Sequence, residues 1–289
     1  MLDTILQNEA LVRLLAFGAM LVAMAIWELA APRRRVEIPR VIRWTNNLGL
    51  VVVDSIVVRL VFPLLAVGLA IIAEDRAWGL LNAIDVPGWL AVLVAVLILD
   101  FAIYLQHVLF HAVPAFWRLH RVHHADLEFD LTTGLRFHPI EIILSMIWKM
   151  AFVAALGAPP IAVLVFEVVL NATSIFNHSN IALPRGVDAV LRLFLVTPDM
   201  HRVHHSVHVR ETNSNFGFNL PWWDRLFGTY NAQPRDGHKE MTIGIEQFRT
   251  TDDLRLDRML VQPFVESTGN YPLGGPSKAT PKKDDDTSP

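Results

Sequence analysis

The chain has 289 residues, of which 53% are hydrophobic and 18% are charged. A composition this apolar argues against an ordinary soluble enzyme and points to a membrane protein. The formal net charge of −3 gives no reason to expect a nucleic-acid partner. Because the chain has no cysteine, disulfides, thiolate metal sites, cysteine nucleophiles and iron–sulfur clusters are excluded. Any metal must therefore be bound through nitrogen or oxygen.

Apolar runs long enough to cross a bilayer predict three membrane helices in the first part of the chain. They cover residues 10–31, 48–73 and 86–110. A histidine-rich stretch follows, and then two shorter apolar runs, 140–156 and 161–176, which a Gly-Ala-Pro-Pro sequence separates. This turn signal predicts a helical hairpin. Because both shorter runs contain charged residues, the number of crossings stays open at about four or five.

Charge in the connecting loops predicts the orientation of these helices. The loop between the first two spans carries an excess of arginine over the single Glu37; the arginines are Arg33, Arg34, Arg35, Arg40 and Arg43. The positive-inside rule assigns such a loop to the cytoplasm. The following helices then bring every histidine cluster to the same side. We therefore expect an integral, multi-pass protein of a bacterial inner membrane, with its metal site on the cytoplasmic side.

Ten of the twelve histidines lie between positions 107 and 205, and they are grouped. The sequence HVLFH places two imidazoles four residues apart, on one helix face. The pentapeptide HRVHH occurs twice, and each copy places three imidazoles on one face. Two further histidines, in RFHPIE and FNHSN, border the predicted hairpin. In chain order the ten are His107, His111, His120, His123, His124, His138, His178, His201, His204 and His205.

Ten imidazoles exceed what one metal ion can accept, because even octahedral coordination offers only about six places. The histidine count therefore predicts two metal ions. Imidazole suits iron, zinc, copper and nickel, so the ligand type leaves the metal open. Two other interpretations compete. One is a histidine-rich membrane metal-binding or metal-transport protein without oxygenase activity, although transporters place their ligands near the midplane. The other is a bis-histidine haem, which needs only two axial ligands and leaves the other histidines unexplained.

These motifs resemble those of the fatty acid hydroxylase and sterol desaturase superfamily, whose signature is an HxxxH box followed by two HxxHH boxes. The resemblance extends through LDFAIYLQH, TTGLRFHPIE, NSNFG and WWDRLFGTY, and it covers roughly residues 95–230. Membership implies an all-α fold. This fold is a polytopic bundle of four or five membrane helices with a cytosolic helical cap that holds a dinuclear, histidine-rich metal site.

The resemblance also implies the chemistry. The ten histidines would bind two iron ions, for which zinc could substitute in purified protein, and dioxygen would be the co-substrate. The enzyme would hydroxylate or desaturate a C–H bond of a sterol, a fatty acyl chain or another lipid. Beyond the metal ligands no separate catalytic residue is needed, because the oxidising power belongs to the metal–oxygen species.

Several polar residues near the boxes are candidates to support the ligands. Asp100 lies two helical turns before His107 and could orient its imidazole, although a helix–helix contact is equally compatible with this position. Asn215 could hold a metal-bound water or simply form a turn. Glu141 could orient an imidazole or cap a helix, as could Asp126 and Asp130. We expect His208 to be a neighbour of the site and not a ligand, and His238 to be solvated.

The remaining organisation follows from composition and from the chemistry that the resemblance implies. The chain has no flavin, haem-attachment or iron–sulfur motif, so electrons must come from a separate donor, such as a ferredoxin, a cytochrome b5-like protein or a reductase. The other expected partners are membrane lipids and a lipophilic substrate. We divide the chain into an N-terminal segment at 1–9, a catalytic membrane domain at 10–230, a cytosolic or interfacial extension at 231–276 and a disordered tail at 277–289.

Overall fold

The computed structural model describes residues 2–265 and 267–273. Within these ranges the chain is helical, as predicted, and its only β-structure is two isolated bridges. Five segments are long and apolar enough to cross a membrane. The chain is therefore an integral, multi-pass membrane protein. The predicted disordered tail at 277–289 lies outside the described residues.

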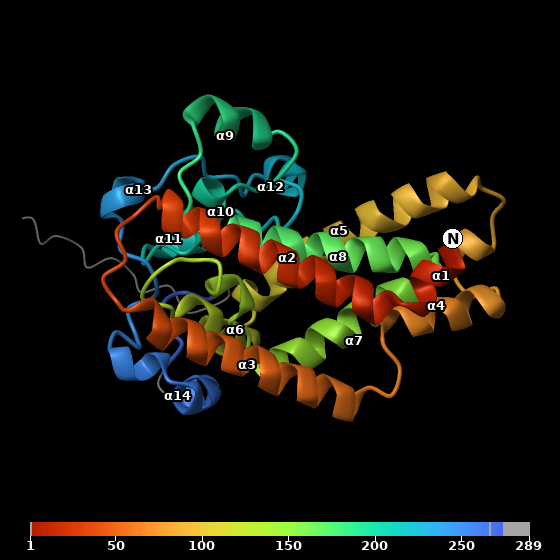
Figure 1. Ribbon diagram of the computed structural model, residues 1–289, viewed down its shortest axis with the longest axis horizontal. Coiled ribbons are helices and arrows are strands. Elements are labelled where there is room, and N and C mark those ends of the chain that lie inside the picture. Colours follow the sequence, from red (N-terminus) through yellow and green to blue (C-terminus); the bar gives the residue numbers. More distant parts are fainter. Residues whose placement is uncertain (1, 266, 274–289) are drawn as a thin grey trace, which may run out of the picture.

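Long helices form the membrane part of the molecule and short helices form a cap (Figure 1). The membrane part consists of α1 (Leu2–Gln7), α2 (Glu9–Ala30), α3 (Arg40–Val61), α4 (Ala66–Asp75), η1 (Leu80–Asn82), α5 (Gly88–Ala112), α7 (Pro139–Leu156) and α8 (Pro160–Asn177). The cap consists of α6 (Pro114–His124), η2 (Thr133–Leu135), α9 (Arg185–Leu191), α10 (Pro198–His204), α11 (Val209–Thr212), α12 (Trp222–Phe227), α13 (Gly237–Glu240), η3 (Thr251–Leu254), α14 (Leu256–Val261) and η4 (Gln262–Phe264).

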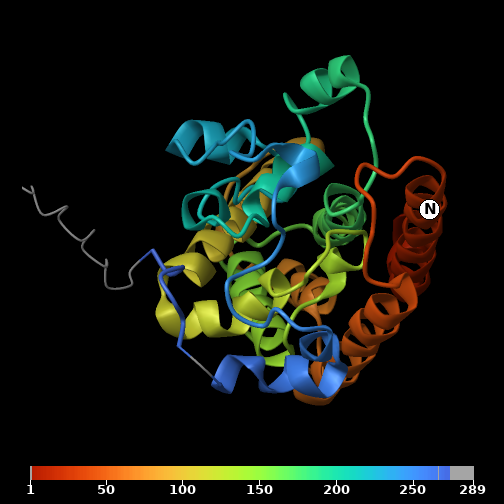
Figure 2. The same ribbon diagram turned by 90° about the vertical axis from the view of Figure 1, so that its left-hand side faces the viewer.

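The direction of the long helices brings all the histidine boxes to one end of the bundle. Figure 1 shows that α2, α5 and α8 end at the cap, whereas α3 and α7 begin there. The segments between α5 and α7 and after α8 therefore meet in the cap, although they are far apart in sequence. Figure 2 looks at the cap end and shows the C-terminal helix α14 beside α3. The backbone N–H of Leu256 donates to the side chain of Asn46 at this contact.

The second predicted span, residues 48–73, is not one continuous helix. Helix α3 ends at Val61, Phe62 has extended backbone angles, and α4 begins only at Ala66. Pro63 explains the break, because proline lacks an N–H and disfavours helical angles in the residue before it. Helix α4 then packs against α7 and α8. The hairpin between those two helices turns at Gly157, whose φ of 61° favours glycine.

Charged residues inside the membrane part pair with one another. Glu167 on α8 accepts from Arg13 on α2 at 2.6 Å and also from Lys149 on α7. Its carboxylate is 4% exposed. Lys149 and Glu167, two of the charged residues in the predicted hairpin, therefore face the bundle interior. An ion pair there avoids the cost of an isolated charge in lipid. The surrounding core is apolar, with Leu99, Val153 and Phe166 fully buried.

A second buried charge network joins α3 to the loop that follows α6. The Arg43 guanidinium donates to both carboxylate oxygens of Asp126, at 2.8 and 2.7 Å, and to Asp130 and Thr133. All four residues are completely buried. Although burial alone would raise the pKa of Asp126, the neighbouring Arg43 lowers it to about 2. The two aspartates thus hold the cap to the membrane part and do not orient imidazoles.

Candidate metal centre

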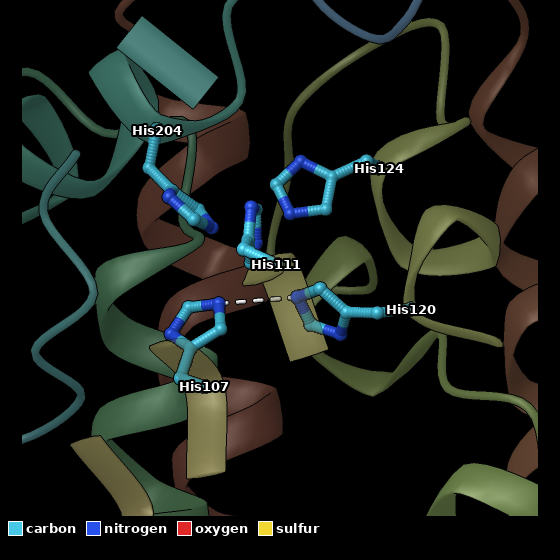
Figure 3. A group of neighbouring side chains, drawn as sticks. All are labelled: His107, His111, His120, His124 and His204. Atoms are coloured by element: carbon cyan, nitrogen blue, oxygen red, sulfur yellow. Dashed lines mark hydrogen bonds between the residues drawn. The ribbon is translucent and has the colours of Figure 1, made fainter. Parts of the chain in front are cut away.

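Nine buried histidines converge in the cap and form two adjacent groups. Within each group, one ring nitrogen per residue lies within 4.8 Å of the others, and no side chain is more than 5% exposed. Figure 3 shows the rings of the first histidine group pointing toward a common centre. The first histidine group is His107, His111, His120, His124 and His204, and the second histidine group is His123, His178, His201 and His205.

Each HRVHH box contributes to both groups. Its first and last histidines, four residues apart, go to one group, and its middle histidine goes to the other. The first box places its outer pair, His120 and His124, in the first histidine group. The second box places its outer pair, His201 and His205, in the second histidine group. Consecutive histidines therefore face different groups, and the rings of His124 and His205 lie 4.6 Å apart between centroids.

Local sequence places these boxes. Helix α5 extends past its membrane part, so that the HVLFH pair stands at its cap end. Pro114 occupies the first turn of α6 and starts a new helix directly after α5. Thr197 caps α10 by accepting the Met200 N–H, and Pro198 follows at the first helical position. His178 is the C-cap residue that directly follows α8.

Backbone carbonyls fix the orientation of three rings. Each carbonyl accepts from the Nδ1 atom of a histidine, so the proton lies on Nδ1 and the lone pair lies on Nε2. The pairs are His107 with Phe216 (2.8 Å), His178 with Ser174 (2.8 Å) and His204 with Ser214 (2.7 Å). These three imidazoles are therefore prepared to bind a cation through Nε2.

Side chains orient two more rings in the same way. The Nδ1 atom of His120 lies 2.6 Å from the carboxylate of Glu141, and that of His111 lies 3.0 Å from Oδ1 of Asn213. Glu141 was among the candidates from the sequence. The sequence does not predict a role for Asn213, although this residue opens the NSNFG motif that also contains the candidate Asn215. A carboxylate or amide oxygen on the outer nitrogen raises the basicity of the inner one.

The inner nitrogens of each group face one another. Nε2 of His107 lies 3.1 Å from Nε2 of His120, and both rings carry their proton on Nδ1. Nε2 of His178 lies 3.2 and 3.0 Å from the Nε2 atoms of His123 and His201. The lone pairs of His107 and His120 repel each other at this distance unless a cation lies between them.

Burial strengthens this argument. Desolvation lowers the pKa of His120 and of His178 to about 3, so both rings are neutral and can act as ligands. Both ring nitrogens of His124 and of His205 are buried without a hydrogen-bond partner among the described residues. Buried polar atoms of this kind are costly unless something satisfies them. The donor set fits metal ions that accept imidazole, and it does not suit calcium or magnesium, which prefer oxygen.

Two residues that the sequence predicts as part of the site have other roles. His138 caps α7 by accepting the Ile140 N–H at 3.2 Å, and its other nitrogen lies 3.2 Å from the Leu260 carbonyl, so it joins neither group. Asn215 has a φ of 52° and bonds the Asn231 backbone through both ends of its amide, as a turn residue does.

Asp100 also has a different partner from the one expected. Its carboxylate accepts from Nε1 of Trp223 at 2.7 Å, which docks α12 on α5. Outside the groups, His208 pairs with Asp236 at 2.6 Å. The expectation that His238 is solvated is wrong, because its side chain is buried.

A cavity of about 460 Å³ extends from the membrane helices to the first histidine group. His107 and His120 line its cap end, together with Phe110, Phe137 and Phe218, and the other lining residues come mainly from α2, α3, α5, α7 and α8. No histidine of the second group is among the described residues that line it. The volume lies within the usual range for a small-molecule site.

Comparisons with known proteins agree with this site. Residues 92–229, which contain both histidine groups, match the family model described as fatty acid hydroxylase. Ornithine lipid hydroxylase OlsE of Rhizobium tropici is 32% identical over 152 residues, which are 53% of this chain and 45% of that protein. Alkylglycerol monooxygenase of Homo sapiens is 32% identical over 137 residues, 46% of this chain and 29% of that protein.

Cholesterol 25-hydroxylase of Rattus norvegicus is 31% identical over 158 residues, 54% of this chain and 51% of that protein. The chain thus spans about half or less of the length of these relatives. No solved structure matches it. The matched segment contains all three histidine boxes, HVLFH and the two copies of HRVHH. On these grounds residues 92–229, just under half of the chain, are similar to the fatty acid hydroxylase family.

Proposed function

We propose that the chain is a membrane-bound, non-haem di-iron oxygenase that hydroxylates a C–H bond of a lipid. The observation that carries the proposal is the pair of adjoining histidine groups, in which nine buried imidazoles converge at the end of an apolar bundle. The relatives support it, because their names describe hydroxylases or a monooxygenase of three different lipids. For the same reason we favour hydroxylation over desaturation.

In this proposal the protein binds and orients the reactants. Two iron ions, held by the first and second histidine groups, would supply the activation of dioxygen. The chain's own residues fix the ligand rings through Nδ1 and exclude water from them. The Phe137 ring, for example, stacks on His123 with a centroid distance of 4.5 Å. A lipid chain would enter the cavity from the membrane and present a C–H bond beside His107 and His120.

The sidedness of the membrane and the source of electrons belong to the same proposal. The arginine-rich segment between α2 and α3 lies at the cap end of the bundle, which supports a cytoplasmic position for the histidines. For a chain whose relatives include a Rhizobium protein, we propose the bacterial inner membrane. A ferredoxin, a cytochrome b5-like protein or a reductase would deliver the electrons from the cytoplasm.

A metal-transport protein is the less favoured alternative. Transporters typically place ionisable ligands near the middle of the membrane. Here the two histidine groups lie at the cap end of the long helices. The curated relatives named above are hydroxylases and a monooxygenase, which also does not favour transport.

The test compares lipids from cells that express the full chain under isotopically labelled dioxygen. We expect one lipid class to gain the mass of one labelled oxygen atom. His204→Ala removes a ligand of the first histidine group and should abolish this product and lower the metal content. His208→Ala is the matched control, since this histidine pairs with Asp236 outside both groups. Full turnover by His204→Ala, or an unlabelled product, would contradict the proposal.

A further inference from the structure

The cavity contains a buried carboxylate that nothing in the described chain satisfies. Asp54 on α3 is 8% exposed, lines the cavity, and makes no hydrogen bond or ion pair with any described residue. An unpaired acid at membrane depth is costly, and such residues are typically retained for a function. Arg59 lines the same cavity but forms no ion pair with Asp54, because it follows by five residues and so lies about 140° further around the helix.

A second unsatisfied oxygen lies in the same cavity. Gln106 on α5 donates through Nε2 to the Ser145 hydroxyl on α7 at 2.5 Å, while its Oε1 is buried without a partner. Glu167, deeper in the cavity, is paired with Arg13 and with Lys149. The unsatisfied atoms are the Oδ1 of Asp54, an acceptor in the ionised carboxylate, and the Oε1 of Gln106, also an acceptor. A ligand that completes them must therefore bring hydrogen-bond donors.

These residues lie close to the level of the histidines. Gln106 directly precedes His107 of the first histidine group. Ser145 follows Glu141, the partner of a ligand histidine, by one helical turn. Asp54 follows Leu50, which packs against α6, by one turn as well. One turn is roughly 6 Å. A polar group of a lipid bound here would place a carbon of the same lipid, only a few bonds from that group, beside the candidate metal centre.

We propose that Asp54, together with Gln106 and Ser145, binds the polar group of the lipid substrate, and that this group is a hydrogen-bond donor, either a hydroxyl or an ammonium. The inference rests on the proposed function, and it specifies the substrate class of that cavity. A plain hydrocarbon, or an ether or ester oxygen that only accepts, leaves both acceptors unsatisfied. The preferred substrates are amphiphiles whose oxidised carbon lies near their donor group.

The experiment measures binding of matched probes to the full chain in lipid nanodiscs. 1-Hexadecanol, hexadecylamine and hexadecyl methyl ether share one alkyl chain, and the ether has no donor. Each displaces radiolabelled 1-hexadecanol. We expect the alcohol, the amine or both to bind about tenfold or more tightly than the ether, as for one buried hydrogen bond to a charged group.

Variants assign this preference to its residue. Asp54→Leu should reduce the best probe to the affinity of the ether. Asp54→Asn keeps an oxygen acceptor but not the charge, so it should retain a preference for the alcohol and lose one for the amine. This contrast distinguishes a hydroxyl substrate from an ammonium substrate. Ser55→Ala is the matched control, because Ser55 lines the same cavity but already bonds the Val51 carbonyl.

Equal affinities of all three probes for the unchanged chain would overturn the inference, and so would a preference that survives in Asp54→Leu. The comparison of probes on the unchanged chain stands even if that variant does not fold, which its metal content and gel-filtration profile report. Binding requires no turnover. A chain that selects donors through Asp54 but oxidises no lipid would refute the proposed function alone, whereas an active chain without the selection would refute this inference alone.

Discussion

At the scale of single residues, Gly134 lies so close to the second histidine group that no larger side chain fits there. A Cβ atom at Gly134 would lie 2.6 Å from the carbonyl oxygen of Ser174 and 2.8 Å from Nδ1 of His178. These two atoms form the hydrogen bond that fixes the His178 ring. A side chain as small as a methyl group would therefore push the ring away from the bond that orients it.

We expect Gly134→Ala to lower the metal content of the chain and to destabilise the fold by about 1–3 kcal/mol, as overpacking of a close-packed interior does. Metal analysis of the purified chain and thermal unfolding in detergent measure the two effects. Gly186→Ala is the control, since a Cβ there meets nothing within 4 Å. Equal metal content in the two variants would show that the close contact at Gly134 does not matter.

Sequence spacing predicted the histidines much better than their supporting residues. The structure brings nine of the ten predicted ligands into two groups. Repeats of three and four residues on a helix are local geometry, which a sequence contains. The partners of His138, Asp100 and Asn213 are not local. Leu260 and Trp223 lie more than a hundred residues away from the side chains that they contact, so only the folded chain reveals those roles.

At the scale of elements, α3 is attached to the cap by Arg43. Its guanidinium pairs with two buried carboxylates, Asp126 and Asp130, in the loop between α6 and η2. Removing one partner of a buried ion pair leaves an uncompensated charge. We expect Arg43→Met to destabilise the folded chain by about 3–5 kcal/mol. Thermal unfolding in detergent measures the loss.

The control for this variant must remove an equal charge from the same end of the bundle. Arg35→Met does so, and Arg35 is exposed. Both variants reduce the positive charge that orients the membrane helices. Only Arg43→Met also removes the guanidinium that pairs with the two buried aspartates. If the two variants unfold at the same temperature, the buried network contributes little and the positive charge alone matters.

Hydropathy located most of the membrane helices well. The ends of α2, α5, α7 and α8 lie within two residues of the predicted runs. The break between α3 and α4 was missed because residues 48–73 are apolar on both sides of Pro63, and hydropathy does not detect a change of direction. In lipid, a break of this kind requires that neighbouring helices satisfy or cover the freed backbone groups.

At the scale of the whole molecule, the candidate metal centre joins the membrane part to the cap. Its histidines come from the cap end of α5, from α6, from the end of α8 and from α10 and its C-terminal flank. Hydropathy distinguishes an apolar part of the sequence from a polar part, but it does not predict where the two parts touch. The contact forms only when segments about a hundred residues apart fold together, and no local sequence pattern contains this information.

Chelation of the metal should therefore loosen the cap. We expect a lower temperature of unfolding and faster proteolysis of the segment between α8 and α12, because the facing lone pairs then repel. The loss should amount to roughly several kcal/mol. His208→Ala should respond to chelation as the unchanged chain does, and His204→Ala should respond less. An unfolding temperature that chelation does not change would mean that the cap is stable without its ions.

The exchange of histidines between the two HRVHH boxes has a consequence for stoichiometry. Each box holds three imidazoles on one short, rigid helical turn, and it serves both groups. If two ions bind as proposed, an ion in one group would fix both turns and position the histidines of the other group, so that the second ion would lose less entropy on binding. Loading of the pair would then be cooperative, and chains with a single ion would be scarce compared with chains that hold none or two.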